Sequence, residues 1–530
     1  MRSKARWLVL AAIVTAAACG GSDGSGGSIG SGGSGSGGTN GSWTAGVFEP
    51  STSFQNQCAS PRTGIDPATG KRYPDVKGST LTENRFLRSW TNELYLWYRE
   101  VPDLNPASYS TPDYFNVLKT TATTPSGNPK DRFHFTYPTA QWEALSQSGV
   151  EAGYGAQFLV LASRPPRLVR VAYTEPGSPA TAASANLGRG ATVLTVDGVD
   201  VVNATDSASV DKLNEGLFPS QAGASHTFSI LDVGASAPRT ITMVSADVTA
   251  TPVQNVGTIS TASGKVAYML FNDHLATSEQ ALVNAFRQLA GTNVTDLVID
   301  IRYNGGGYLD IASEVAYMVA GPGPTAGRTF EKTVFNDKYT TRDPVTGAVI
   351  QPIPFYSTSQ GFSVPNGQAL PTLNLSRAVV LTGANTCSAS ESIINGLSGV
   401  GVRVVQIGST TCGKPYGFYP QDNCGTTYFS IELKGVNDQG FGDYPDGFSP
   451  ANSTGPVGVQ MPGCAVADDF DHALGDPKEG RLAAALEYLA NGTCPAASAV
   501  PGAVAGAQAP VLGEGSLYRS PWRENRIFRR

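Results

Sequence analysis

One stretch, from Asn385 to Lys414, constrains the fold more than any other part of the chain. The β-branched run at 378–381 that precedes it is typical of a buried strand. Apolar residues at helical spacing then predict a helix from Ala389 to Ser398, and a further apolar run predicts a strand at 402–407. This alternation of strands and helices indicates an α/β architecture.

Ser388 lies at the predicted turn between strand and helix, where its hydroxyl is exposed. The first N–H groups of a helix have no partner within the helix, and with the helix dipole they favour negative charge beside this serine. Acyl transfer requires such stabilisation of charge. Lys414 follows the next strand, so a nucleophile and a base can meet at neighbouring strand ends. A serine here is also a common helix cap, and that purely structural role stays open.

A glycine-rich turn ends another predicted strand upstream. Residues 296–307 read DLVIDIRYNGGG, an apolar run that leads into three successive glycines. Glycines leave the backbone N–H groups uncovered, so this turn is a candidate cradle for an oxyanion.

The motifs DIRYNGGG and TCSASE, followed by a Gly-Lys pair, together resemble the C-terminal processing peptidases, or tail-specific proteases, over roughly residues 80–490. The resemblance implies a serine endopeptidase with a Ser–Lys catalytic pair, a crotonase-like (ClpP-like) α/β core and an inserted PDZ domain. It assigns the nucleophile to Ser388 and the general base to Lys414. It also implies that the oxyanion donors are the N–H groups of Ala389 and Gly306, and that no cofactor or metal is needed.

The residues after the lysine depart from the family pattern. Family members often carry a glutamine four residues after the lysine, where it orients the amine, but this chain has Phe418 there. Gln421 is the nearest glutamine and is our candidate orienter. A lysine must be neutral to accept a proton from serine, and an apolar pocket favours the neutral form. The residues expected to form that pocket are Val404, Val405, Ile407, Tyr416 and Phe418.

At 530 residues the chain is too long for one hydrophobic core, so several domains are expected. The expected regions are a small helical N-terminal region at 43–149, a PDZ-like β-rich insert at 150–250 and the catalytic domain at 251–495. In the first region, Thr80 and Glu83 predict a capping box at a helix start. In the last, residues 414–450 show little periodicity, which predicts irregular structure.

The PDZ-like insert carries the candidate peptide-binding residues Gly153, Tyr154, Gly155 and Ala156, which precede a predicted strand. Their order, with a Pro-Gly-Ser-Pro-Ala segment and a Val-Asp-Gly turn downstream, is similar to that of PDZ domains. Such domains bind extended peptide ends by adding a strand to a sheet edge, with loop N–H groups holding the terminal carboxylate. A small β-rich domain without a ligand is the alternative.

The two ends of the chain predict export and anchoring. Residues 1–19 combine basic residues with a short apolar run and end at Cys19 in a pattern similar to a bacterial lipoprotein signal, with ordinary cleavage after an Ala-x-Ala site as the alternative. The Gly/Ser-rich stretch at 20–42 predicts a flexible tether. Residues 496–530 predict a flexible tail with basic residues at its end.

Six of the seven cysteines remain if Cys19 is lipidated, and an even number in an exported chain suggests disulfides. Cys387 precedes the candidate nucleophile and Cys412 precedes the candidate base, so a bridge between them is one hypothesis. A bridge between Cys412 and Cys424 is another. Cys387 as the nucleophile is a lesser alternative.

The sequence therefore predicts a membrane-anchored, exported or periplasmic serine endopeptidase that cleaves unfolded or C-terminal peptide substrates. A net charge of −6 without a basic patch in the core argues against a nucleic-acid partner. Two alternatives stay open. One is a catalytically weak peptide-binding lipoprotein on the same fold, and the other is a crotonase-like acyl-CoA enzyme.

Overall fold

The computed structural model describes residues 43–454, 458–495, 517 and 526–528. The predicted signal, Cys19 and nearly all of the tail lie outside these residues. Among the described helices, none has both the length and the apolar character needed to cross a bilayer.

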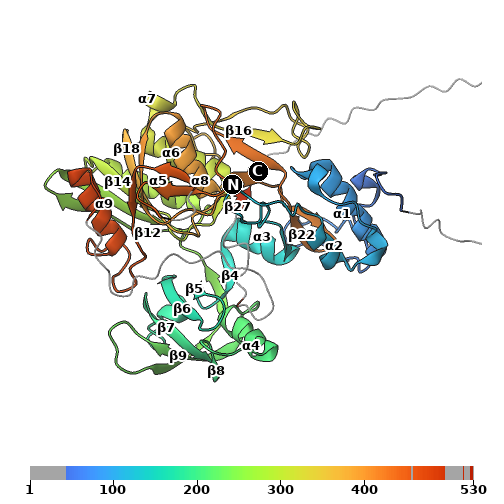
Figure 1. Cartoon of the computed structure of the whole chain (residues 1–530), viewed down its shortest axis with the longest axis horizontal. Coiled ribbons are helices and arrows are strands. Elements are labelled where there is room, and N and C mark those ends of the chain that lie inside the picture. The colour runs from blue at the N-terminus through green and yellow to red at the C-terminus, as the bar shows by residue number, and fades with distance from the viewer. Residues whose placement is uncertain (1–42, 455–457, 496–516, 518–525, 529–530) are drawn as a thin grey trace, which may run out of the picture. The chain divides into compact units, whose positions relative to one another are not determined.

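The region expected to be catalytic is built around a six-stranded sheet, here called the catalytic sheet, with the order β12-β13-β14-β18-β19-β26 (Figure 1). All neighbouring pairs from β13 to β26 are parallel, and β12 is antiparallel to β13. The strands are β12 (Val253–Thr261), β13 (Gly264–Phe271), β14 (Asp296–Asp300), β18 (Arg377–Thr382), β19 (Arg403–Gly408) and β26 (Gly463–Ala465). The helices are α5 (Ser278–Ala290), α6 (Leu309–Ala320), α7 (Pro322–Thr325), α8 (Ala389–Gly399) and α9 (Gly480–Asn491).

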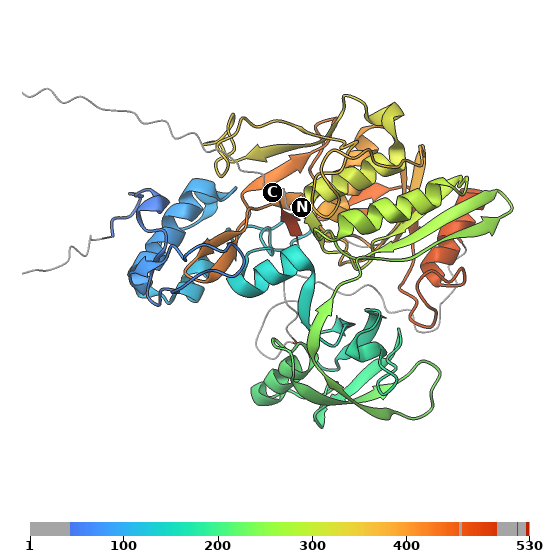
Figure 2. The ribbon, with the colours of Figure 1, turned by 180° about the vertical axis from the view of Figure 1, so that it is seen from behind.

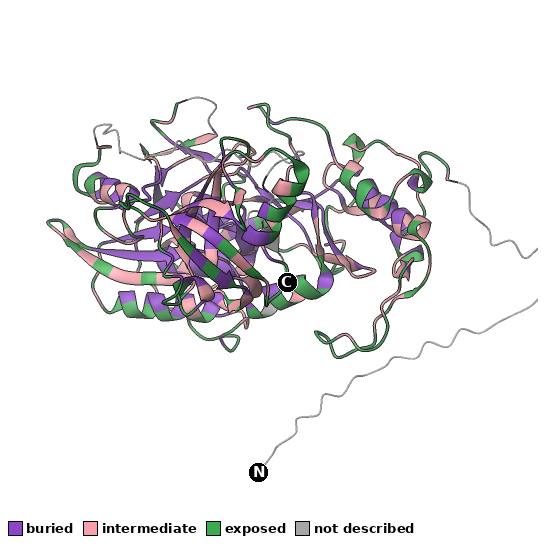
Figure 3. Ribbon diagram, turned by 90° about the horizontal axis from the view of Figure 1, so that it is seen from below, coloured by how far each residue is buried: buried purple, intermediate pink, exposed green. Residues whose placement is uncertain are grey.

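Both faces of this sheet are covered by helices, because its strands direct apolar side chains to both faces. On β13, Ala267, Met269 and Phe271 belong to a core shared with α5, α6 and α8. Tyr268 and Leu270 belong to a second core, shared with α9. Figure 2 shows α5 and α6 over the face nearest the viewer, and Figure 3 shows buried residues concentrated in the sheet and its helices. Successive strand residues point to opposite faces, so a strand buried on both sides reads as one continuous apolar run.

Residues 150–250, which we call the insert, form a second sheet with the order β10-β9-β7-β6-β5, and β8 pairs with β7. The elements are β5 (Ala156–Ala162), β6 (Leu168–Thr174), β7 (Thr192–Val196), β8 (Val199–Asp200), α4 (Ser207–Leu217), β9 (Ser225–Leu231) and β10 (Arg239–Val244). The strand that enters the insert, β4 (Val150–Gly153), pairs with the one that leaves it, β11 (Ala246–Thr249). Within the insert, β5 is an edge strand of its sheet.

A buried arginine joins the insert to the catalytic sheet through a shared carboxylate. Arg302, which follows β14, donates to Asp468 at 2.8 Å and to Glu479 at 2.6 Å. Arg189 of the insert donates to the same Asp468 oxygen at 2.8 Å. Burial by itself would raise the pKa of Asp468, but the guanidinium groups of Arg481, Arg302 and Arg189 lower it well below its ordinary value.

The N-terminal region contains α1 (Thr80–Leu94), α2 (Thr111–Val117) and α3 (Thr139–Ser148), with the short strands β1 (Gln57–Cys58), β2 (Val76–Lys77) and β3 (Phe135–Pro138). The predicted capping box is wrong by one residue, because Ser79 caps α1 and Thr82 supplies the reciprocal bond. The Glu83 carboxylate instead accepts the N–H of Ala59. Glu83, which the local pattern assigned to the helix cap, thus binds a residue outside the helix instead.

The remaining strands form smaller sheets outside the six-stranded one. They are β15 (Gly306–Tyr308), β16 (Thr329–Phe335), β17 (Ile353–Pro354), β20 (Tyr416–Gly417), β21 (Gln421–Asn423), β22 (Thr426–Phe429), β23 (Leu433–Val436), β24 (Phe448–Pro450), β25 (Val459–Met461) and β27 (Arg526–Phe528). Residues 414–450, predicted to be irregular, therefore contain several short strands. Some of their partners are distant in sequence, as in the pairings of β22 with β3 and of β23 with β16, and the strands are too short for local periodicity to reveal them.

Candidate active site

Ser388 lies at a strained turn between β18 and α8. Its φ is +63° and its ψ is −119°, a conformation that residues with a side chain rarely adopt. The hydroxyl oxygen is buried and makes no hydrogen bond to any residue that the structure describes. Residues on both sides of Ser388 are bound to the glycine-rich turn. The carbonyl oxygen of Asn304 accepts the Cys387 N–H and the Ser390 hydroxyl, both at 3.1 Å.

The carboxylate of Glu391 joins the turn that carries Ser388 to the loop that carries Lys414. One of its oxygens accepts the N–H of Ser388 at 2.9 Å and the N–H of Lys414 at 2.8 Å. The other accepts the Gly413 N–H at 2.8 Å and the Thr411 hydroxyl. Burial raises the pKa of Glu391, and these hydrogen bonds oppose that rise. Since both backbones bind the same oxygen, Ser388 and Lys414 are neighbours in space.

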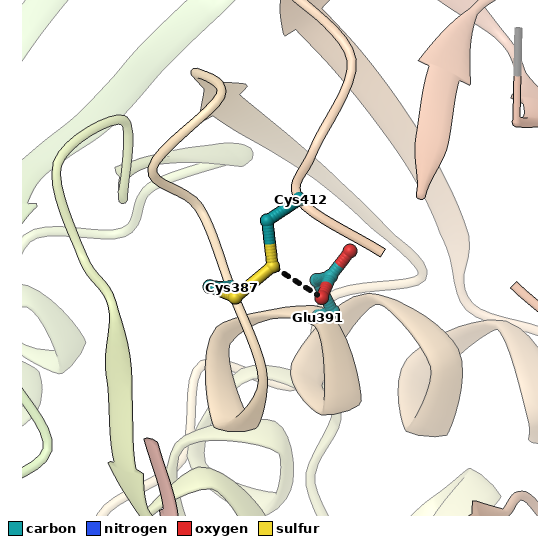
Figure 4. A group of neighbouring side chains, drawn as sticks. All are labelled: Cys387, Glu391 and Cys412. Atoms are coloured by element: carbon teal, nitrogen blue, oxygen red, sulfur yellow. Dashed lines mark hydrogen bonds between the residues drawn. A yellow bond between two sulfur atoms is a disulfide. The ribbon is translucent and has the colours of Figure 1, made fainter. Parts of the chain in front are cut away.

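A disulfide makes the same connection covalently. Cys387 and Cys412 are bridged, with their Cα atoms 5.2 Å apart, and Glu391 lies beside the bridge (Figure 4). The prediction of this bridge is thus confirmed, whereas Cys412 does not pair with Cys424, which is bonded to Cys58. With both sulfurs oxidised, this group offers no thiolate to a metal ion.

Lys414 is fully buried, and its side-chain nitrogen lies against two aromatic rings. The nitrogen is 4.0 Å from the ring centre of Phe418 and 5.2 Å from that of Phe133. Phe418 and Tyr416, which were expected near the lysine, belong to the aromatic cluster that also contains Phe133. The expected contribution of Val404, Val405 and Ile407 is wrong, because these side chains fill the two cores on either face of the catalytic sheet.

The glycine-rich turn contacts the serine turn through the backbone of Asn304. Asn304 accepts the Gly306 N–H at 2.9 Å and the His274 Nδ1–H at 3.0 Å through its side-chain oxygen. The candidate oxyanion donor Gly306 is therefore engaged within the protein in this structure. Gly307 has a φ of +142°, and a Cβ atom there would lie 2.4 Å from the carbonyl oxygen of His274, so only glycine fits. Ala389, the other candidate donor, is the first residue of α8, where its N–H has no acceptor within the helix.

Gln421, the candidate orienter of the lysine, has a different hydrogen-bond partner. Its side-chain amide donates to the carbonyl oxygen of Asp422 at 2.8 Å, and no hydrogen bond from Gln421 to Lys414 is seen among the described residues.

The candidate peptide-binding residues line a pocket beside β4 and β5. Gly153, Gly155 and Ala156 face it, but Tyr154 is buried and donates its hydroxyl to the carbonyl oxygen of Gly216. Glu175 lines the same pocket, and burial raises its pKa to about 7. At higher pH a terminal carboxylate bound here would therefore face like charge.

Sequence reasoning missed three side chains of the site, namely Glu391, Phe133 and His274. Glu391 had a signal, since it stands three residues after Ser388 in a capping-box spacing. Phe133 and His274 had none, because they reach the site from distant strands and loops.

The catalytic region matches the family model described as Peptidase family S41 over residues 264–418. Residues 82–137 match the model described as Peptidase S41 N-terminal domain. No curated protein matches the sequence.

Among solved structures, a putative S41 protease from Bacteroides fragilis is similar at 24% identity, with 79% of this chain and 98% of that chain covered and a TM-score of 0.54. The photosystem II D1 C-terminal processing protease is similar at 20% identity, with 77% of this chain and 100% of that chain covered and a TM-score of 0.44. The first of these likenesses supports the mixed α/β fold, and the family match at residues 264–418 covers both the serine turn and the lysine loop. The chain is a peptidase whose catalytic and N-terminal regions match the models of family S41.

Proposed function

We propose that this peptidase is a serine endopeptidase in which Ser388 is the nucleophile and Lys414 the general base. One observation carries the assignment. A single oxygen of the buried Glu391 carboxylate binds the backbone N–H groups of both residues. The disulfide between Cys387 and Cys412 ties the same two segments together.

In the proposed reaction, the Ser388 hydroxyl oxygen attacks a peptide carbonyl carbon while its proton passes to the Lys414 amine. The N–H of Ala389 stabilises the oxyanion, joined by that of Gly306 once it leaves Asn304. The lysine then gives the proton to the leaving amine. Water attacks the resulting ester with Lys414 again acting as base, which releases the second product.

Two effects compete for the charge state of Lys414. Burial disfavours a charged ammonium by several kcal/mol, whereas a cation–π contact stabilises it by about 0.5–2 kcal/mol. Because Lys414 is fully buried, desolvation is the larger effect and favours the neutral amine that the reaction requires.

The substrates we propose are unstructured or C-terminal segments of exported proteins. The three disulfides support export, since such bonds persist in oxidising compartments. The signal-like residues 1–19 and a lipid on Cys19 would place the enzyme at a membrane surface, facing the periplasm or the exterior. The insert, with its exposed sheet edge at β5, would act as a PDZ-like peptide-binding module.

The second candidate function is a peptide-binding protein with little turnover. It is favoured by Phe418, whose ring faces the lysine nitrogen and cannot orient the amine by a hydrogen bond.

Cleavage of casein by the chain from residue 42 onward tests the assignment. We expect Ser388→Ala and Lys414→Met to abolish turnover while the melting temperature changes little. Lys434→Met, which alters an exposed lysine on β23, is the control and should keep full activity. Turnover that survives in Ser388→Ala would overturn the nucleophile assignment. An inactive wild-type protein that still binds peptides would favour the second candidate.

A further inference from the structure

The C-terminal segment of the chain reaches the candidate active site. Residues 526–528 form β27, which pairs in parallel with β15, so that Gly306 lies opposite Arg526 and Tyr308 opposite Phe528 (Figure 1). The same strand also contacts β20, which begins two residues after Lys414. The tail therefore adds a strand between the glycine-rich turn and the lysine loop.

This position is where an extended substrate would bind. One edge of β15 is already occupied, because the Tyr308 N–H donates to the carbonyl oxygen of His274 at 2.9 Å and the His274 N–H donates to that of Gly306. The other edge is open to strand addition, a common way of binding an extended peptide. In this structure β27 occupies that edge.

A second contact of the tail lies in the insert. Leu517 is buried, and it belongs to the hydrophobic core that contains Phe158 of β5 and Leu213 of α4. Its N–H donates to the carbonyl oxygen of Ser163, just beyond the edge strand β5, at 3.4 Å. Two separate parts of one tail thus bind at the two places where the proposed function needs a peptide.

We propose that the C-terminal segment is an intramolecular ligand of this peptidase, anchored in the insert by Leu517 and laid across the catalytic site by residues 526–528. It competes with substrate for the free edge of β15. This proposal rests on the proposed function only where turnover of a peptide substrate is measured. A tethered ligand has an effective concentration of order millimolar, so even weak docking raises the substrate concentration needed for half-maximal turnover.

Two full-length variants remove the two contacts independently. Leu517→Asp places a charge in the core of the insert, and Ile527→Pro removes a backbone N–H within β27. We expect each to lower KM for a peptide substrate by about tenfold with kcat unchanged, because an intramolecular competitor acts only on binding. Leu512→Asp makes the same leucine change in the same tail and should leave KM at the wild-type value.

A binding experiment without turnover separates this proposal from the proposed function. In the Ser388→Ala background, a fluorescent peptide of residues 513–530 should bind Leu517→Asp and Ile527→Pro at least tenfold more tightly than the parent with its native tail. Equal affinities for all three proteins would overturn the proposal, whether or not the enzyme turns over casein. A wild-type KM that rises with enzyme concentration would also overturn it, because the tail would then come from a second copy.

Discussion

At the scale of single residues, the site depends on buried side chains that hold Ser388 and Lys414 in position. Glu391 fixes both backbones, and Phe418 and Phe133 surround the amine. Apart from the carboxylate of Glu391, these neighbours are apolar rings. Burial and the faces of the two rings therefore both act on the reactivity of the lysine.

Replacing Phe418 by leucine tests the effect of the ring on the base. The substitution keeps an apolar neighbour but removes a cation–π contact worth up to about 1–2 kcal/mol, so the charged amine loses stabilisation. We expect the acidic limb of the pH profile of kcat/KM to move to lower pH by about one unit.

The control is Phe135→Leu, which truncates a ring of the same cluster that stacks on Phe429. Phe135 is not one of the rings found over the lysine nitrogen, so this variant should lose stability without moving the pH profile. The same displacement in both variants would show that general loosening of the cluster is responsible.

At the scale of elements, covalent and hydrogen-bonded links fix the helix and loops around the site. Two disulfides close loops of similar size, since Cys387–Cys412 spans 25 residues and Cys464–Cys494 spans 30. On a chain-entropy estimate, each loop constrains the unfolded state by about 3.5 kcal/mol. Removing either disulfide should therefore cost a similar amount of stability, whereas only Cys387–Cys412 lies beside the candidate active site.

We expect Cys387→Ala/Cys412→Ala and Cys464→Ala/Cys494→Ala to lower the free energy of unfolding by similar amounts. Only the first pair should also lower kcat, by about tenfold or more, because small displacements of a nucleophile are costly in rate. Both variants are compared by denaturant titration and by steady-state kinetics. Equal kcat values would mean that Glu391 alone positions the two segments.

His134 links β3 to α2 and predicts a pH dependence of stability. Its Nε2–H donates to the carbonyl oxygen of Phe115 at 2.8 Å, and burial lowers its pKa to about 4. Between about pH 6.5 and pH 4 this histidine is protonated in the unfolded chain but neutral in the folded chain. The free energy of unfolding therefore falls as the pH is lowered, by about 3 kcal/mol over this range. Above pH 6.5 this histidine does not make the free energy of unfolding depend on pH.

Denaturant titrations at several pH values measure this effect. His134→Gln keeps a donor for Phe115 but cannot titrate, so it should be less stable at neutral pH and show a smaller loss between pH 6.5 and 4. An unchanged slope would assign the effect to other groups.

At the scale of the whole molecule, one buried carboxylate connects the insert to the catalytic sheet. Asp468 binds Arg302 and Arg189, and its pKa is held well below the ordinary value. A lowered carboxyl pKa contributes stability that is complete above about pH 4 and is lost as the pH falls through the folded value.

We expect Asp468→Asn to lower the free energy of unfolding at pH 7 by about 3–5 kcal/mol, because the buried Arg189 loses the carboxylate that it binds and Arg302 keeps only Asp300 and Glu479. The difference from the wild type should shrink at acidic pH. The control is Asp337→Asn, which breaks an exposed ion pair with Arg99 and should change little. A small effect at Asp468 would indicate that water or Glu479 compensates.

The local patterns of the sequence predicted the elements around Ser388 well, since β18, α8 and β19 each carry their own apolar periodicity. They failed where position depends on distant partners. The valines of β19 were expected to line the lysine pocket, but a strand covered on both faces directs its side chains into the two cores. Leu517 lies in a stretch without periodicity, so its burial in the insert had no signal in the sequence.

The bridge between Cys387 and Cys412 bears on when this enzyme first becomes active. A newly made chain in a reducing compartment keeps its cysteines as thiols, so one of the two links between the serine turn and the lysine loop does not yet exist. We expect the reduced, newly synthesised chain to cleave peptides more slowly than the oxidised one, and an assay before and after oxidation would show it. Under the export proposed above, proteins of the compartment that makes this peptidase would be spared until it has left that compartment.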